Sequence, residues 1–238
     1  MTQSNLSKDP KVVVALDYSN EADAMQLVNQ LDPQLCRLKV GKELFTAEGP
    51  RFVEKLINKD HSVFLDLKFH DIPTTVGKAC EAASKLGVWM LNVHASGGID
   101  MMKEAQNGVA RSGHFPLLIA VTVLTSMNQA MLNQVGVAGE LTNQVLNLAQ
   151  LTKQAGLDGV VCSAAEACLL RKAHGADFCL VTPGIRPIDA SINDQSRAVS
   201  PELAVKLGSN YLVVGRPITK AENPLKALEE INKSIKYN

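Results

Sequence analysis

The sequence lacks the features that mark a nucleic-acid binder or a metal-centred protein. Lys plus Arg and Asp plus Glu both number 24, so no net charge would draw the chain to nucleic acid or to an anionic membrane. The five cysteines are scattered, without a C-x-x-C pair or a histidine at metal-ligand spacing. We therefore expect reduced core cysteines, no metal, no nucleic-acid partner, and local charge at any anion site.

A leader and a membrane span are lacking as well. The first ten residues, MTQSNLSKDP, are polar and do not contain the apolar stretch of a secretory signal. No apolar run approaches the ~18 residues of a membrane span. These absences predict a cytoplasmic protein without a membrane partner.

What the sequence does contain is a repeated alternation of short β-branched runs with longer segments of helical period. This pattern indicates βα units and a parallel sheet. Eight strands are predicted: Val12–Asp17, Arg37–Gly41, Val63–Lys68, Met90–His94, Leu117–Leu124, Gly159–Cys162, Phe178–Thr182 and Tyr211–Gly215. The clearest helical patterns cover Glu21–Leu31, Thr74–Leu86, Leu141–Ala155, Pro201–Leu207 and Pro224–Ile235.

The number of βα units decides the fold class. Eight units in 238 residues fit a (β/α)8 TIM barrel, and the first turn, LDYSN, has none of the glycines of a doubly wound nucleotide-binding sheet. No linker divides the chain, so we expect a single α/β domain over residues 1–238. The polar loop Pro187–Arg197 is unusually long, which favours a functional role.

A TIM barrel places its functional residues at the C-terminal ends of the strands. This rule selects Asp17, Lys39, Asp66, Lys68, Asp71, His94, Thr125, Ser126, Arg186 and Arg216. Of these, His94 either lines the pocket or is a packed, hydrogen-bonded histidine.

The third predicted strand carries two of the charges. Strand alternation puts Asp66 and Lys68 on one face, and Lys39 on the second strand would add a third charge. The other face is apolar, with Val63, Leu65, Leu67 and Phe69. Such a cluster is either an ion-pair network that fixes strand register or an active site. Its position at strand ends favours an active site, in which a desolvated lysine can donate a proton.

The turns after the seventh and eighth predicted strands each combine glycine with arginine. TPGIRP contains Pro183, Gly184 and Arg186, and VVGRPIT contains Gly215 and Arg216. Many barrels bind phosphate at these two strands through backbone N–H groups, and the guanidinium groups would add forked donors. Ordinary loop glycines with surface arginines are the alternative, but two such turns at the two expected strands favour a phosphate site.

With these residues identified, the segment DLKFHDIPTT, which runs from Asp66 to Thr75, resembles the D-x-K-x-x-D-I-P-x-T signature of orotidine 5'-monophosphate decarboxylases. The similarity continues in family order through ALD, LKVG, NVHASGG, AVTVLTS, DGVVCSA, TPGIRP and VVGRPIT, and is of the bacterial type. The resemblance implies a TIM-barrel homodimer, free of cofactor and metal. It would convert orotidine 5'-monophosphate to uridine 5'-monophosphate in de novo pyrimidine synthesis.

The resemblance also implies residue roles. Lys68 would protonate C6 of the pyrimidine as carbon dioxide leaves, and Asp66 would lie beside the departing carboxylate. Lys39 and Asp71 would complete the charged network, with Asp71 contributed by the other subunit. Because no electron-sink cofactor signature is present, the developing carbanion would have to be stabilised by preorganised charge.

The remaining residues implied by the resemblance would bind substrate. Ile72 and Thr75 would come from the other subunit and enclose the ribose and pyrimidine. Asp17 and Lys39 would hold ribose hydroxyls, and either Thr125 or Ser126 would meet the pyrimidine edge. Pro183 would line the site, and the phosphate would be bound by Arg186, Gln195, Gly215 and Arg216.

Two rival functions remain to be weighed. Magnesium-dependent sugar-phosphate decarboxylases and aldol synthases share the barrel and D-x-K-x-x-D, but they carry an acidic metal ligand where this chain has Lys39, a cation that would repel the metal. The other rival is a non-catalytic nucleotide-binding barrel. The presence of Lys68 in an otherwise complete site disfavours it.

Overall fold

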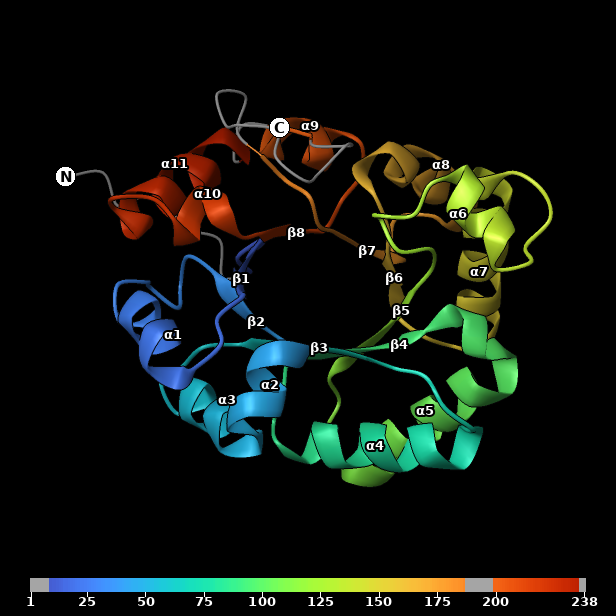
Figure 1. Ribbon diagram of the computed structural model, residues 1–238, viewed down its shortest axis with the longest axis horizontal. Helices are drawn as coiled ribbons and strands as arrows, with labels where there is room; N and C mark the ends of the chain where they lie inside the picture. The colour runs from blue at the N-terminus through green and yellow to red at the C-terminus, as the bar shows by residue number, and fades with distance from the viewer. Residues whose placement is uncertain (1–8, 187–198, 236–238) are drawn as a thin grey trace.

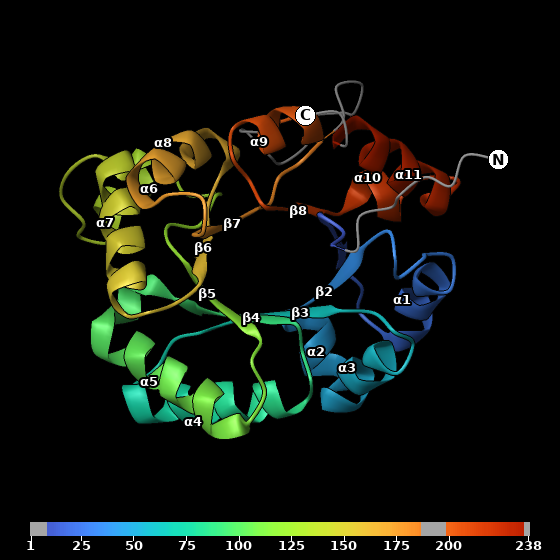
Figure 2. The ribbon, with the colours of Figure 1, turned by 180° about the vertical axis from the view of Figure 1, so that it is seen from behind.

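The eight strands pair in sequence order and close into a parallel barrel in a computed structural model that describes residues 9–186 and 199–235. Figure 1 looks down the barrel, and Figure 2 shows the same ring from behind. The strands are β1 (Val12–Leu16), β2 (Arg37–Gly41), β3 (Val63–Phe69), β4 (Met90–His94), β5 (Leu117–Val121), β6 (Gly159–Val161), β7 (Cys179–Thr182) and β8 (Tyr211–Val214). The predicted (β/α)8 barrel is confirmed.

The predicted strand ends agree with these bounds within one residue, except at β5. Its extension to Leu124 was wrong, because the chain leaves the sheet after Val121. Thr122, the residue directly after the strand, still contacts β6: its backbone N–H and its hydroxyl both donate to the Val161 carbonyl, at 3.5 and 3.2 Å. The chain then enters the turn that contains Thr125.

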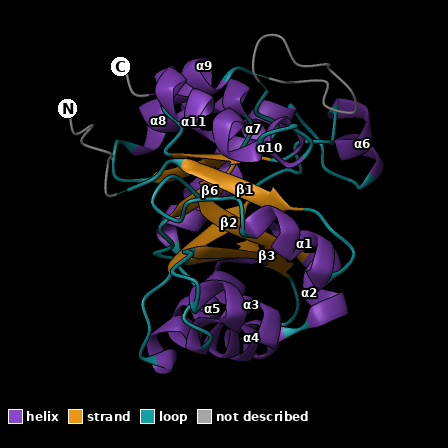
Figure 3. Ribbon diagram, turned by 90° about the vertical axis from the view of Figure 1, so that its left-hand side faces the viewer, coloured by secondary structure: helices purple, strands orange, loops and turns teal. Residues whose placement is uncertain are grey.

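Helices surround the strands, as the side view in Figure 3 shows. They are α1 (Glu21–Val28), α2 (Lys42–Glu48), α3 (Pro50–Ile57), α4 (Pro73–Lys85), α5 (Gly98–Ser112), α6 (Gln129–Gln134), α7 (Leu141–Gln154), α8 (Ala164–His174), α9 (Pro201–Lys206), α10 (Arg216–Thr219) and α11 (Pro224–Ile235), with the 3-10 turn η1 (Ala95–Gly97). All five helical patterns from the sequence are present, with ends shifted by at most three residues. Among the described residues, no helix is long and apolar enough to span a membrane.

Strand alternation divides the apolar residues between two layers. Side chains on the outer face of the sheet, such as Val63 and Leu65, pack against the helices in the larger core cluster. A second cluster fills the barrel interior, with Val13, Ala15, Phe64, Met90, Ile119, Cys179, Val181 and Val213. Burial of this interior drives closure of the barrel.

The buried side chain of Arg37 packs against two aromatic rings at the N-terminal end of the barrel. The guanidinium carbon of Arg37 lies 4.1 Å from the ring centre of Trp89 and 5.0 Å from that of Tyr211, and its Nη2 donates to Asp9 at 2.6 Å. The flat cation stacks on the aromatic faces and remains paired. The charged residues that the sequence selects for the site, Lys39, Asp66 and Lys68, lie toward the opposite, C-terminal end of the strands.

Helices α4 and α5 pack against each other through two glycines. A Cβ built on Gly108 would lie 2.0 Å from the carbonyl oxygen of Gly77, so any side chain there would force the helices apart. Figures 1 and 2 both show the two helices side by side. Because α4 starts directly after Asp71 and Ile72, this contact sets the position of the helix that follows these two residues.

Candidate active site

A backbone irregularity near the end of β3 positions Lys68. The ladder to β4 pairs Leu65 with Leu91 and then Phe69 with Val93, so β3 has two more residues than β4 between these pairs. Lys68 has a φ of 54°, in the left-handed region that non-glycine residues seldom adopt. Such a conformation costs on the order of 1–3 kcal/mol and persists only where surrounding contacts hold it.

The carboxylate of Asp66 is the centre of the charged cluster. Its Oδ1 accepts hydrogen bonds from Nζ of Lys68 at 2.6 Å and from Nδ2 of Asn92 at 2.7 Å. Its Oδ2 lies 3.4 Å from Nζ of Lys39. Asp66 and Lys39 are each only 8% exposed, so both charges depend on these partners for the solvation that water would otherwise give.

Lys39 connects Asp66 to a second carboxylate. Its Nζ lies 3.3 Å from Oδ1 of Asp17, just beyond the end of β1. Gly41 leaves room for the ammonium, because a Cβ there would lie 3.1 Å from Nζ. The sequence-predicted charges therefore form one chain of alternating sign, Asp17–Lys39–Asp66–Lys68, across β1, β2 and β3.

Two adjoining cavities open along this chain. The larger, about 460 Å³, is lined by Asp17, Lys39 and the residues that follow β7 and β8. The smaller, about 180 Å³, is lined by Asp66, Lys68 and mainly apolar side chains. Both are lined by Lys39, Pro183 and Val213. They are therefore two halves of one site, one lined by several charged side chains and one suited to a flat, partly apolar group.

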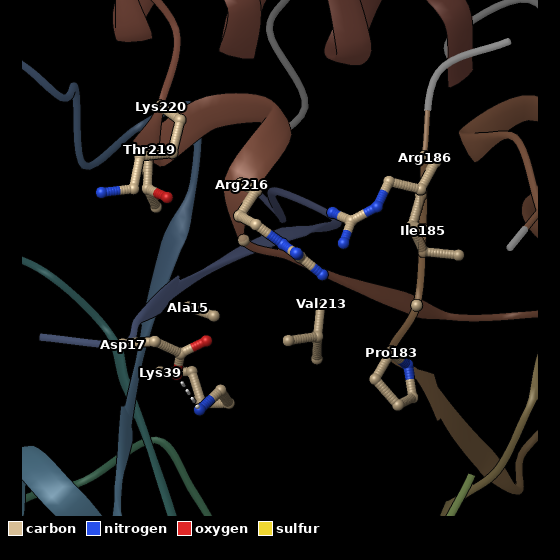
Figure 4. Close-up of a pocket in the computed structure, with 12 residues that line it drawn as sticks. Ala15, Asp17, Lys39, Pro183, Ile185, Arg186, Val213, Arg216, Thr219 and Lys220 are labelled. Atoms are coloured by element: carbon tan, nitrogen blue, oxygen red, sulfur yellow. Dashed lines mark hydrogen bonds and ion pairs between the residues drawn. The ribbon is translucent and has the colours of Figure 1, made fainter. Parts of the chain in front are cut away.

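The far end of the larger cavity has the character of an anion site. Arg186 and Arg216 both line it, and Figure 4 shows their guanidinium groups turned toward the same space. Gly184, which has a φ of 79°, allows the turn that places Arg186 there. Gly215 lines the same cavity. The two guanidinium groups at this end suit an anionic group of a ligand. Asp17 and Lys39 at the other end suit hydroxyl groups of the same ligand, at a distance from the anion.

The other sequence-predicted site residues fall into three groups. Thr125 lines the smaller cavity, whereas Ser126 is not among its lining residues. Asp71, Ile72 and Thr75 line neither cavity of this chain and are exposed, and Oδ1 of Asp71 accepts the N–H of Ile72 at 2.7 Å. Gln195 and the whole of the polar loop Pro187–Arg197, which was predicted to be functional, lie outside the described residues.

His94 is half-buried at the end of β4, with its ring centre 5.5 Å from that of His70. Burial lowers the pKa of His94 to about 4, and the nearby charges of His70, Lys42 and Lys68 act in the same direction. The imidazole is therefore neutral near pH 7. It lines neither cavity, which favours the packed histidine of the two alternatives.

Sequence reasoning missed several residues of the site. The most important is Asn92 on β4, which is fully buried and bonds to both Asp66 and Lys68. The signal was a lone amide in the apolar strand MLNVH, two residues from Met90 and so on the same interior face. Thr219, the last residue of the VVGRPIT segment, and the adjacent Lys220 also line the larger cavity.

Comparison with known proteins agrees with this geometry. Residues 10–231 match the model of the orotidine 5'-phosphate decarboxylase / HUMPS family. The orotidine 5'-phosphate decarboxylase of Pseudoalteromonas atlantica is 58% identical over 229 residues, covering 96% of this chain and 99% of the relative. That of Hydrogenovibrio crunogenus is 57% identical over 235 residues, covering 99% of both.

A solved structure gives the same result for the fold. The crystal structure of orotidine 5'-phosphate decarboxylase from Lactobacillus acidophilus superposes with a TM-score of 0.87 at 40% identity, covering 96% of this chain and 100% of that one. The match in sequence and fold extends over nearly the full chain and includes the strand ends that build the site. The chain therefore belongs to the orotidine 5'-phosphate decarboxylase / HUMPS family.

Proposed function

We propose that this protein decarboxylates orotidine 5'-monophosphate to uridine 5'-monophosphate in pyrimidine biosynthesis, the activity named for its relatives. The observation that carries the proposal is the charge chain Asp17–Lys39–Asp66–Lys68 between an arginine-lined cavity and a smaller apolar one. The substrate phosphate would lie between Arg186 and Arg216. The ribose would then meet Asp17 and Lys39, and the pyrimidine would enter the smaller cavity.

The chemistry follows from where this pose puts C6 of the pyrimidine. The bond from C6 to the carboxylate breaks, carbon dioxide leaves, and the electron pair stays on C6. Lys68 donates a proton from Nζ to C6, and the neutral amine is protonated again from solvent. Asp66 holds Nζ of Lys68 at 2.6 Å before reaction, so the stabilising cation is in place as charge develops.

The position of Lys39 argues against magnesium chemistry at this site. Its ammonium lies 3.4 Å from Asp66 and 3.3 Å from Asp17, so it already occupies the space between the two carboxylates that a divalent cation would need. Binding Mg²⁺ there would place two positive centres within a few ångströms. This disfavours the magnesium-dependent members of the family as functional models.

The exposed D-I-P-x-T residues lead us to propose a shared active site. Ile72 is 66% exposed, and neither it nor Asp71 lines a cavity of its own chain. In a homodimer these residues would contribute to the neighbouring subunit's site, with Asp71 completing the charge chain beside Lys68. Thr75 would be contributed in the same way.

The function is tested by turnover in the presence of a chelator. Purified protein should consume orotidine 5'-monophosphate, followed by its ultraviolet absorbance, at a rate unchanged after exhaustive treatment with EDTA, because Lys39 takes the place of a metal. Activity that disappears with EDTA and returns with Mg²⁺ would contradict the metal-free mechanism. No turnover with or without Mg²⁺ would contradict the enzyme assignment.

The phosphate assignment predicts a selective effect of Arg216→Ala. Loss of a charge-assisted hydrogen bond should lower kcat/KM for the nucleotide, which corresponds to an increase of about 1.5–3 kcal/mol in the activation free energy. The nucleoside orotidine, which has no phosphate, should be affected far less. Lys226→Ala removes an exposed cation on the next helix that lines neither cavity and serves as the control. An equal loss of kcat/KM for both substrates would show that Arg216 has a structural role and does not bind the phosphate.

The shared site is tested by mixing two inactive variants, Lys68→Ala and Asp71→Asn, under conditions that allow subunit exchange. If Asp71 serves the neighbouring subunit, each mixed dimer has one native site and one doubly damaged site. Random exchange of equal amounts makes about half of the dimers mixed and restores about a quarter of all sites. Steady-state activity should rise toward that fraction.

A matched mixture controls for unspecific recovery. Lys68→Ala mixed with Asp66→Asn should regain nothing, because those two residues lie 2.6 Å apart in one chain and every site keeps a lesion. Exchange is followed independently with mass-labelled subunits. If exchange is complete and the Lys68→Ala and Asp71→Asn mixture stays inactive, Asp71 acts within its own chain.

A further inference from the structure

The buried side chain of Asn92 forms hydrogen bonds with both Asp66 and the backbone of Lys68, and it does so with opposite ends of its amide. Its Nδ2 donates to Oδ1 of Asp66 at 2.7 Å, and its Oδ1 accepts the N–H of Lys68 at 2.8 Å. The side chain is 0% exposed, so water cannot replace either bond. Only a group that is donor and acceptor at once satisfies both neighbours.

The position of Asn92 in the sheet explains why the contact is needed. Leu91 and Val93 pair with Leu65 and Phe69, so Asn92 lies opposite the irregular stretch that holds Asp66 and Lys68. There the backbone N–H of Lys68 lies outside the regular ladder, and leaving a partly buried N–H unpaired is costly. The Asn92 carbonyl accepts this N–H and so holds Lys68 in its left-handed conformation.

We propose that Asn92 is a positioning residue for the decarboxylation. It holds the Asp66 carboxylate in the orientation that accepts Nζ of Lys68, and it holds the backbone from which that lysine reaches the smaller cavity. The inference rests on the proposed function and adds to it a residue that acts only through Asp66 and Lys68. Asn92 lines neither cavity, so it does not meet the substrate directly.

The first test is the effect of Asn92→Ala on kcat and KM, measured separately. Misplacing the proton donor by a fraction of an ångström should lower kcat on the order of 10- to 100-fold, whereas KM should change less than about threefold, because the phosphate and ribose contacts lie elsewhere. If kcat is unchanged while the protein folds and the wild type turns over, the inference is overturned. If the wild type has no activity, the proposed function has failed instead.

The second test uses a variant whose protonation state can be set. Asn92→Asp has nearly the same shape, but its carboxylate would repel Asp66 when ionised and could not donate to it. When protonated, its carbonyl could accept the Lys68 N–H and its hydroxyl could donate to Asp66, which restores both bonds. Two carboxylates that share one site hold a proton to higher pH than either alone.

This variant therefore predicts rescue by acid. The ratio of kcat for Asn92→Asp to kcat for wild type should rise as the pH is lowered from about 8 to about 5.5, while the same ratio for Asn92→Ala should stay flat. The ionisable groups around this position are Asp66 and Lys68 on β3, Lys39 on β2, and His94 with His70 beyond it. All are common to the three proteins, so their own titration largely cancels in the ratios.

Asn232→Asp is the matched control. Asn232 is also a buried asparagine, 8% exposed, but it donates to the carbonyls of Leu35 and Leu228, ahead of β2 and within α11. Its replacement should lower the melting temperature without a pH-dependent kcat ratio. The same pH dependence in the Asn232 variant, or its absence in Asn92→Asp, would make Asn92 merely structural. Should Asn92→Asp not fold, the kcat of Asn92→Ala decides the question.

Discussion

The site depends on one constraint: the buried negative charge of the Asp66 carboxylate has to be paired. It is buried at the mouth of a barrel, where an unpaired charge would be expensive, and it is held by Lys68, Asn92 and Lys39 from three neighbouring strands. Satisfying that carboxylate fixes two ammonium groups at defined places. The fold thus stabilises its own buried charge with the groups that the proposed chemistry uses.

The same arrangement links the two ends of the site. Lys39 lines both cavities, so the reacting end and the arginine-lined end share one buried, ion-paired side chain. In the proposed pose, a ligand anchored between Arg186 and Arg216 would extend past Lys39 toward the smaller cavity, which Lys68 lines. Binding energy from the remote phosphate can then contribute to orientation at the reacting carbon.

The sequence predicted the parts of this structure that depend on periodicity, and it missed those that depend on departures from it. Alternation placed Asp66 and Lys68 inside the barrel, with Val63 and Leu65 outside. It could not predict the left-handed backbone of Lys68, because the irregular pairing with β4 appears only when two strands distant in sequence meet. Asn92 was missed for a different reason: alternation puts it on the interior face, but its hydrogen-bond partners, Asp66 and Lys68, lie on another strand. The role of Asp71 stays a prediction, since it concerns a second chain.

A double-mutant cycle between Lys39 and Asp66 tests the central claim most directly. Lys39→Met leaves the Asp66 carboxylate with Lys68 but without Lys39, and Asp66→Asn leaves the Lys39 ammonium with Asp17 but without Asp66. The double variant removes both members of this buried pair. Each substitution raises the activation free energy for kcat/KM by some amount. If the two groups act as one network, the increase in the double variant should be smaller than the sum of the two single increases by more than about 1 kcal/mol. Effects that add within about 0.5 kcal/mol would contradict the account.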